Sequence, residues 1–145
     1  MNIYVASSWR NARQPEVVAA LRRIGHKVYD FRNPSEGDSR FHWSEIDPKW
    51  QRWDAGSFVN GLDHPLAIDG FRKDLDALRA ADGVVLVMPC GRSSHLEFGF
   101  AVGQEKHCAI LLSDGEPELM YLMAHGQLYT RIRDLLVSPP WALAP

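Results

Sequence analysis

Cysteine is scarce in this sequence, and long apolar runs are absent from it. The 145 residues include two cysteines, Cys90 and Cys108, which are too few for a disulfide framework, so a reducing, cytoplasmic location is expected. No apolar stretch approaches the roughly 18 residues that cross a bilayer, so no membrane association is expected. The N-terminal residues carry neither a basic region nor a small-residue cleavage site, and we therefore expect no secretory signal.

The sequence also lacks an excess of charge of one sign. Its formal net charge is −2, and its basic residues are scattered along the chain. Such a balance provides no electrostatic basis for binding a nucleic-acid polymer or an anionic membrane surface. We therefore expect a small-molecule ligand.

Several site motifs are missing as well. Neither G-x-G-x-x-G nor G-x-x-x-x-G-K-[ST] occurs, so dinucleotide and P-loop binding are not indicated. A zinc deaminase would need a cysteine where Ser93 stands, and a Cys-x5-Arg phosphatase loop would need an arginine where Leu96 stands. The six histidines form no H-E-x-x-H motif. We predict no metal and no cofactor.

Apolar periodicity predicts strands that alternate with helices. The run from Val84 to Met88 is continuously apolar, as in a central parallel strand that is buried on both faces. We predict a single α/β domain over residues 1–145, a parallel sheet of about five strands with helices on both faces, flavodoxin-like or Rossmann-like. The expected strands are 3–6, 26–31, 84–88, 107–112 and 127–129, and the expected helices are 17–24, 66–81, 94–104, 116–124 and 130–137.

A tryptophan-rich insertion after the second strand, residues 33–62, interrupts this alternation. Asp47 and Pro48 suit an N-cap and a first helical position, so a helix is predicted to begin there. The three tryptophans suit packing of the insertion onto the domain, a lid that stacks on an aromatic base, or a subunit interface. These interpretations stay open at the level of the sequence.

Glu97 is the first candidate for a catalytic residue. Ligands of parallel α/β sheets bind beyond the carboxyl ends of the strands, and Glu97 lies one turn into the helix after the third strand. The segment Ser94 to Glu97 also matches a capping box, with Ser94 as the N-cap and Glu97 as the N3 residue. In the catalytic interpretation, the helix N-terminus favours the ionised, nucleophilic carboxylate.

Three further side chains favour the catalytic interpretation of Glu97. Tyr4, in the neighbouring first strand, is placed to orient that carboxylate, although a strand tyrosine with a solvent-exposed tip is the alternative. Asp74 follows Phe71 by three residues, on a helix face expected to pack inward, although a solvated helix edge also fits. Asp82 either contributes to the site or is a turn residue at the end of the same helix.

Two or three acids beside a tyrosine suit cleavage of a glycosidic bond. One carboxylate attacks the anomeric carbon, a second acid protonates the leaving base, and an acceptor then releases the sugar with retained configuration. A 2-deoxy sugar is the easier substrate, because it lacks the hydroxyl that destabilises the oxocarbenium-like transition state. Cys90, which precedes a helix N-terminus, is an alternative nucleophile.

Three segments, in this order, carry a family resemblance: Ile3 to Trp9, Asp74 to Val85, and Glu97 to Gly103. Together they resemble the nucleoside 2-deoxyribosyltransferases and their relatives, the deoxynucleoside monophosphate N-glycosidases. The resemblance implies that Glu97 is the nucleophile, that Tyr4 hydrogen-bonds and positions it, and that Asp74 assists the departing base. It assigns Asp82 a more structural role.

The resemblance also implies substrate contacts after the first strand. Trp9 matches a tryptophan of the base pocket in the transferases, whereas Ser8 and Arg10 match a serine and an arginine near the substrate of the monophosphate glycosidases. The subfamily therefore stays open.

The loop before Glu97 departs from the pattern of the relatives. They often carry an aspartate or serine where Gly91 stands, and glycines where Ser93 and His95 stand. Arg92 and Ser93, at a helix N-terminus, suit either a phosphate contact or an ordinary solvated loop. The complete set of predicted substrate-binding residues is Ser7, Ser8, Trp9, Arg10, Asp82, Gly91, Arg92 and Ser93.

We therefore predict an enzyme of nucleotide salvage that cleaves the N-glycosidic bond of 2′-deoxynucleosides or their monophosphates. A covalent glycosyl-Glu intermediate is expected, with transfer of the deoxyribosyl group to a free acceptor base. Hydrolysis of deoxynucleoside 5′-monophosphates and a non-catalytic nucleotide-binding module are the alternatives. The resemblance also implies a homodimer or higher homo-oligomer in which a neighbour's segment, around Leu119 to His125, completes the site.

Overall fold

The computed structural model describes residues 1–33 and 41–142. The chain divides into two compact units, Met1–Asp30 with Ala80–Pro145, and Phe31–Arg79. The single domain expected over residues 1–145 stays a prediction, and residues 34–40 of the predicted insertion lie outside the described residues. No helix in the described part of the chain is long and apolar enough to cross a membrane.

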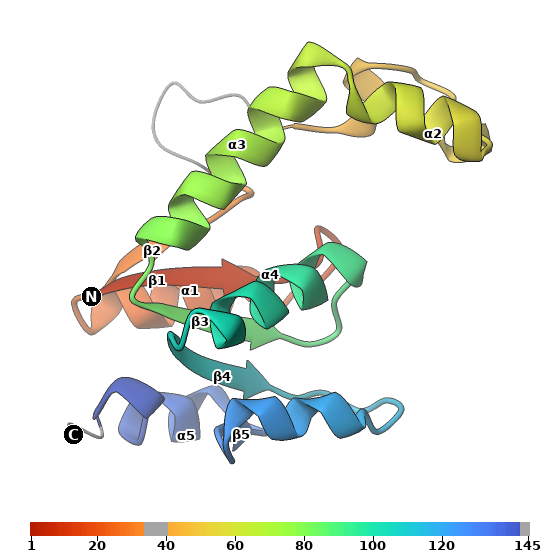
Figure 1. Ribbon diagram of the computed structural model, residues 1–145. Helices are drawn as coiled ribbons and strands as arrows, with labels where there is room; N and C mark the ends of the chain where they lie inside the picture. The colour runs from red at the N-terminus through yellow and green to blue at the C-terminus, as the bar shows by residue number, and fades with distance from the viewer. Residues whose placement is uncertain (34–40, 143–145) are drawn as a thin grey trace. The chain divides into compact units, whose positions relative to one another are not determined.

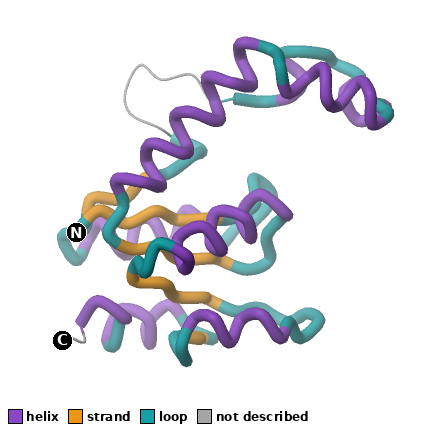
Figure 2. The backbone as a smooth tube through the Cα atoms, viewed as in Figure 1, coloured by secondary structure: helices purple, strands orange, loops and turns teal. Residues whose placement is uncertain are grey.

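The first unit contains a five-stranded sheet in which every pairing is parallel (Figures 1 and 2). The strand order is β2-β1-β3-β4-β5. This sheet confirms the predicted α/β fold. The strands are β1 (Asn2–Ala6), β2 (Lys27–Tyr29), β3 (Gly83–Val87), β4 (His107–Leu111) and β5 (Leu128–Tyr129).

Helices cover both faces of this sheet. Buried residues of α1 and α5 form one apolar cluster with alternate residues of the strands, among them Ile3, Val5 and Val85. Helix α4 contacts β1, β3 and β4, and Figure 1 shows it in front of the sheet with α1 behind. Because side chains alternate along a strand, Tyr4 points to the α4 side. The helices of this unit are α1 (Gln14–Arg23), α4 (Arg92–Gly103), α5 (Ile132–Val137) and the 3-10 helices η3 (Leu119–Ala124) and η4 (Pro140–Ala142).

The second unit follows β2 and contains the tryptophan-rich segment. Its elements are the 3-10 helices η1 (Trp43–Glu45) and η2 (Trp50–Arg52), and the helices α2 (Ala55–Leu62) and α3 (Pro65–Ala80), the last of which ends in the first unit. The prediction of a helix that begins at Pro48 is wrong, because only the short 3-10 helix η2 follows Pro48. The first α-helix of this segment begins instead after Asp54, whose carboxylate accepts a hydrogen bond from the Ser57 backbone N–H at 2.7 Å.

Aromatic side chains of the second unit pack on one another. The ring of Trp43 contacts those of Phe41, Trp53 and Phe58, with centroid separations of 4.9, 5.7 and 5.9 Å. The Trp53 indole N–H donates to a carboxylate oxygen of Asp47 at 2.6 Å. Hydrogen bonds from the Lys49 backbone and from Trp53 lower the pKa of the Asp47 carboxyl.

Gly61 provides a stability test of this aromatic packing. A Cβ atom on Gly61 would lie 2.4 Å from a ring carbon of Trp53, whereas a Cβ atom on Gly56, in the same helix, would have its nearest neighbour at 3.6 Å. We expect Gly61→Ala to destabilise the protein by about 1–3 kcal/mol through overpacking. Gly56→Ala is expected to stabilise it by roughly 0.5–1 kcal/mol, because alanine favours the helix. Denaturant unfolding of both variants measures the difference, and equal stabilities would contradict the Trp53 contact.

Candidate active site

The carboxyl ends of β1 and β3 mark the point at which the strand order reverses. From β1 the chain proceeds to β2 on one side, whereas β3, β4 and β5 follow on the other. Ligands of open parallel sheets bind in the crevice beyond such a switch point. A ligand site is therefore expected at the loops that follow β1 and β3.

A buried polar network joins these two loops. The Ser7 hydroxyl donates to the Val87 carbonyl at 2.8 Å, and the Asn11 amide nitrogen contacts the Ser7 hydroxyl and the Val87 and Pro89 carbonyls at 3.0 to 3.1 Å. The Ser94 hydroxyl donates to the Ser7 carbonyl at 2.9 Å. Sequence reasoning placed Ser7 among the substrate-binding residues and missed Asn11, whose partners are remote in sequence. The Ser7 hydroxyl hydrogen-bonds within this network, to the Val87 carbonyl and the Asn11 amide.

Glu97 lies further along its helix than predicted. Helix α4 begins at Arg92, and its N-cap is Gly91, which has no side chain to cap the helix. Ser94 is therefore the third helical residue, so the capping-box interpretation of Ser94 and Glu97 is wrong. Glu97 falls in the second turn, where the electrostatic effect of the helix N-terminus is weaker than expected in the first.

Glu97 lies in α4, the helix that follows the loop after β3. It is half-buried and one helical turn from two buried residues of α4, Ser94 and Ala101. Burial raises the pKa of the Cys90 thiol to about 11, a hydrogen bond with Ser94 opposes this shift, and the Glu97 carboxylate raises the pKa further. Cys90 lies in the loop after β3, so the Glu97 carboxylate is close enough to this loop to affect the thiol.

The raised pKa argues against Cys90 as a nucleophile, because a thiol reacts as its thiolate. We expect Cys90→Ser to retain the activity of the wild-type protein within a few-fold. Reaction of the Cys90 thiol with iodoacetamide at pH 8 is expected to be slower than that of free cysteine. Loss of all turnover in Cys90→Ser would overturn this assignment.

A histidine and a tyrosine lie beside the same loop, and neither was predicted individually as a catalytic or substrate-binding residue. His95 Nδ1 lies 2.9 Å from the Gly91 carbonyl oxygen and 3.6 Å from Cys90 Sγ. His95 Nε2 lies 2.9 Å from the Tyr121 hydroxyl, and the two rings stack. Since a carbonyl only accepts, Nδ1 carries the proton. Tyr121 comes from η3, in the segment predicted to contribute to a neighbour's site, and here it contacts its own chain.

Tyr4 lies in the middle of β1 with 1% of its surface exposed. It pairs with Tyr29 and Val84, and its ring stacks on that of Tyr29 at a centroid separation of 5.2 Å. The alternative of a strand tyrosine with a solvent-exposed tip is therefore wrong. Tyr4 and α4 share one side of the sheet.

Ser7 is buried in the network described above, and the other predicted substrate contacts comprise a group of exposed or partly exposed residues and Asp82. The exposed or partly exposed group borders the two loops and comprises Ser8, Trp9, Arg10, Gly91, Arg92 and Ser93. Asp82, by contrast, lies at the amino ends of the strands, where its carboxylate accepts a hydrogen bond from the Asn2 backbone N–H at 2.7 Å. Its backbone carbonyl accepts from His107 N–H at 3.2 Å. Asp82 therefore links the amino ends of β1 and β4, and it does not lie at the switch point.

Asp74 belongs to the second unit, on α3, and is half-buried. The prediction that this face of α3 packs inward is only partly correct. Leu78 is buried, but Phe71 is 64% exposed. The role of Asp74 beside Glu97 rests on the sequence resemblance.

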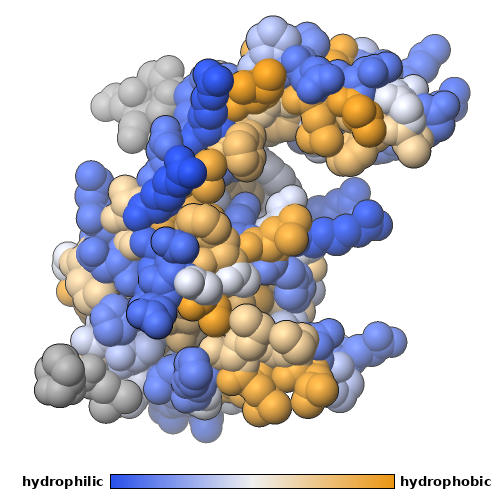
Figure 3. Space-filling view, in the orientation of Figure 1, coloured by the Kyte–Doolittle hydropathy of each residue, from blue (hydrophilic) through white to orange (hydrophobic). Residues whose placement is uncertain are grey.

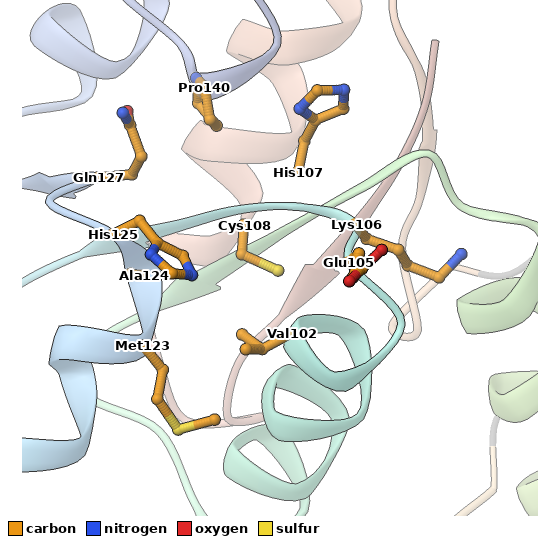
Figure 4. Close-up of a pocket in the computed structure, with 10 residues that line it drawn as sticks. All are labelled: Val102, Glu105, Lys106, His107, Cys108, Met123, Ala124, His125, Gln127 and Pro140. Carbon is orange, nitrogen blue, oxygen red and sulfur yellow. The ribbon is translucent and has the colours of Figure 1, made fainter.

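A cavity of about 290 Å³ lies near the amino end of β4, away from the switch point (Figure 4). Val102, Cys108, Met123 and His125 are among the residues that line it, and His107 marks the amino end of β4 there. None of the predicted catalytic and substrate-binding residues lines this cavity, although Met123, Ala124 and His125 belong to the segment predicted to complete a neighbour's site. In the described ranges 1–33 and 41–142, no three His, Cys, Asp or Glu residues are grouped as metal ligands would be.

Apolar side chains gather on the surface over η3 (Figure 3). Leu119 is 75% exposed, and Met120 and Leu122 are exposed as well. The predicted homo-oligomer, with a contribution from this segment to a neighbouring site, stays a prediction.

No protein-family model matches the sequence, and no curated protein is significantly similar to it. Solved structures are similar. One is a 2-deoxyribosyltransferase from the psychrotolerant bacterium Bacillus psychrosaccharolyticus, with a TM-score of 0.60, 19% sequence identity, and coverage of 93% of this chain and 90% of the other. Another is a CMP N-glycosidase from Clostridium botulinum, with a TM-score of 0.52, 15% identity, and coverage of 94% and 96%.

These comparisons establish the fold over nearly the full length of both chains. The two neighbours are a 2-deoxyribosyltransferase and an enzyme that cleaves the N-glycosidic bond of a nucleotide. The chain therefore has the fold of the nucleoside 2-deoxyribosyltransferases and their N-glycosidase relatives, as its sequence motifs predict.

Proposed function

We propose that this protein cleaves the N-glycosidic bond of 2′-deoxynucleosides or their monophosphates and transfers the deoxyribosyl group to a second base. The observation that carries the proposal is the position of Glu97. Glu97 lies in the second turn of α4, the helix that follows the loop after β3 at the switch point of the parallel sheet, and it does not serve as a helix cap. The fold shared with two enzymes that act on nucleosides and nucleotides supports the same reaction class.

Glu97 is the nucleophile in this proposal. Its carboxylate oxygen forms a bond to C1′ of the sugar while the bond from C1′ to the base nitrogen breaks, and the electron pair leaves with the base. Asp74, as a carboxylic acid, donates a proton to that nitrogen. The products of this half-reaction are a free base and a 2-deoxyribosyl ester of Glu97.

The second half-reaction regenerates the enzyme. A nitrogen of an acceptor base attacks C1′, the Glu97 carboxylate departs, and Asp74 takes up the proton that the acceptor loses. Two displacements at C1′ restore the original configuration. Tyr4 hydrogen-bonds and positions the Glu97 carboxylate, while Ser8, Trp9 and Arg10 bind substrate.

Hydrolysis of a deoxynucleoside 5′-monophosphate is the second candidate function. Arg92 and Ser93 are exposed in the first turn of α4, a twelve-residue helix whose backbone N–H groups favour an anion. The base leaves when the glycosyl ester forms, and attack of water on C1′ of the ester would then release 2-deoxyribose 5-phosphate and the Glu97 carboxylate.

Incubation of the protein with a panel of deoxynucleosides and their 5′-monophosphates, with and without adenine or cytosine, tests the proposal. Base exchange detected by chromatography supports transfer, and free sugar or sugar phosphate supports hydrolysis. Denaturing mass spectrometry of a quenched reaction should detect a covalent 2-deoxyribosyl adduct on the peptide that contains Glu97. Absence of both base exchange and free sugar with every substrate would overturn the enzymatic proposal.

A further inference from the structure

We propose that Asn11 and Ser94 are positioning residues that hold Glu97 in place against the strand that carries Tyr4. This inference rests on the proposed function, and it concerns two residues that lie outside the predicted catalytic and substrate-binding sets. Neither residue needs to touch substrate, because each acts through backbone atoms of the two loops at the switch point.

The geometry of the network carries this inference. Ser94 is 3% exposed and lies one helical turn before Glu97, so both side chains project from neighbouring positions of α4. The Ser94 hydroxyl donates to the carbonyl of Ser7, the residue that follows β1. A single hydrogen bond therefore joins the helix of the nucleophile to the strand of Tyr4.

Asn11 fixes the other side of the same junction. It is 3% exposed, and its amide nitrogen contacts the carbonyls of Val87 and Pro89, at the end of β3 and in the loop that leads to α4. Its amide oxygen accepts from the Arg13 backbone N–H at 2.9 Å, which orients the amide group. Asn11 thus ties the loop after β1 to the loop that sets the start of α4.

A buried network of this kind suits precise placement better than binding. Its polar atoms already have protein partners, and an unsatisfied buried donor or acceptor is costly, so the loop conformations that satisfy it are strongly favoured. For a nucleophile that must approach C1′ in line with the departing base, a misplacement of about 1 Å reduces the rate on the order of 10²-fold.

The variants Ser94→Ala and Asn11→Ala test the inference, with Ser113→Ala as the matched control. Ser113 also donates its hydroxyl to a backbone carbonyl, that of Asp114, but it follows β4 and has no bond to α4. We expect Ser94→Ala and Asn11→Ala to lower kcat per folded molecule on the order of 10²-fold, with KM changed only a few-fold. The folded fraction is measured by circular dichroism at the assay temperature.

The pH profile separates positioning from a general loss of stability. In the proposed site, Tyr4 donates a hydrogen bond that favours ionised Glu97. A displaced carboxylate would lose this hydrogen bond, and the pKa of Glu97 would then rise. Because only ionised Glu97 attacks, the acid limb of the kcat profile should move to higher pH in both variants and stay in place in Ser113→Ala.

Each result decides the inference. A reduced kcat with a shifted acid limb in every variant that folds supports it. Wild-type kcat in the folded variants, or a reduced kcat with an unshifted acid limb, overturns it while leaving the proposed function intact. An inactive wild-type protein overturns the proposed function, and the inference with it.

Discussion

Glu97→Gln is expected to abolish turnover of every deoxynucleoside that the wild-type protein cleaves. The substitution keeps the size of the side chain but removes the charged oxygen that attacks C1′, so no glycosyl ester forms. Loss of a nucleophile that acts within a catalytic unit reduces kcat by roughly 10⁴- to 10⁶-fold. Chromatographic assay of base exchange, with protein concentrations high enough to detect such a decrease, measures the effect.

Glu105→Gln provides the matched control, because Glu105 is exposed just beyond the end of α4 and loses the same charge. Its activity should equal that of the wild-type protein. Nucleotide binding should survive Glu97→Gln, which separates loss of chemistry from loss of the site. Turnover by Glu97→Gln above a tenth of the wild-type rate would remove Glu97 from the mechanism.

Apolar patterning predicts the sheet because the pattern is a direct consequence of burial. All of β3 is buried, and its bounds, Gly83–Val87, differ by one residue from the predicted run. The second strand is shorter than the predicted 26–31. The His26 N–H still donates to the Leu21 carbonyl of the preceding helix, and the Asp30 carboxylate accepts from the Gln14 amide at 2.8 Å.

Long-range hydrogen bonds explain what local patterns miss at the candidate site. Ser94 has the local spelling of an N-cap, but its hydroxyl donates to a carbonyl 87 residues away. Asn11 resembles an ordinary loop residue, yet its amide contacts carbonyls 76 and 78 residues away. No local motif encodes such partners, so both roles require the fold.

Competing short-range bonds explain the errors outside the sheet. The Asp47 carboxylate accepts from the Lys49 backbone, as an N-cap would, and also from the Trp53 indole. The chain makes only a 3-10 turn before the backbone becomes extended at Trp53. The α-helix therefore begins only after Asp54, which is its N-cap. Similarly, the α-helix predicted over 116–124 is replaced by the 3-10 helix η3. Its N-cap residue, Glu118, accepts a hydrogen bond from the Met120 backbone N–H.

Asp74→Asn is expected to lower kcat by about 10²- to 10⁴-fold on ordinary deoxynucleosides, because the departing base then lacks a proton donor. The defect should depend on the leaving group. N7-methyl-2′-deoxyguanosine carries a positively charged base that departs without protonation, so cleavage of this substrate should be nearly unaffected. The kcat ratio of variant to wild type on the two substrates measures the contribution of the acid.

This dependence tests a role that rests on the sequence resemblance. Asp76→Asn is the matched control, since Asp76 lies on the same helix, is exposed, and pairs with Arg79 at 3.9 Å. It should leave both substrates unaffected. An equal decrease of kcat on both substrates in Asp74→Asn would show that Asp74 does not protonate the base, and Glu97 would then require a different acid partner.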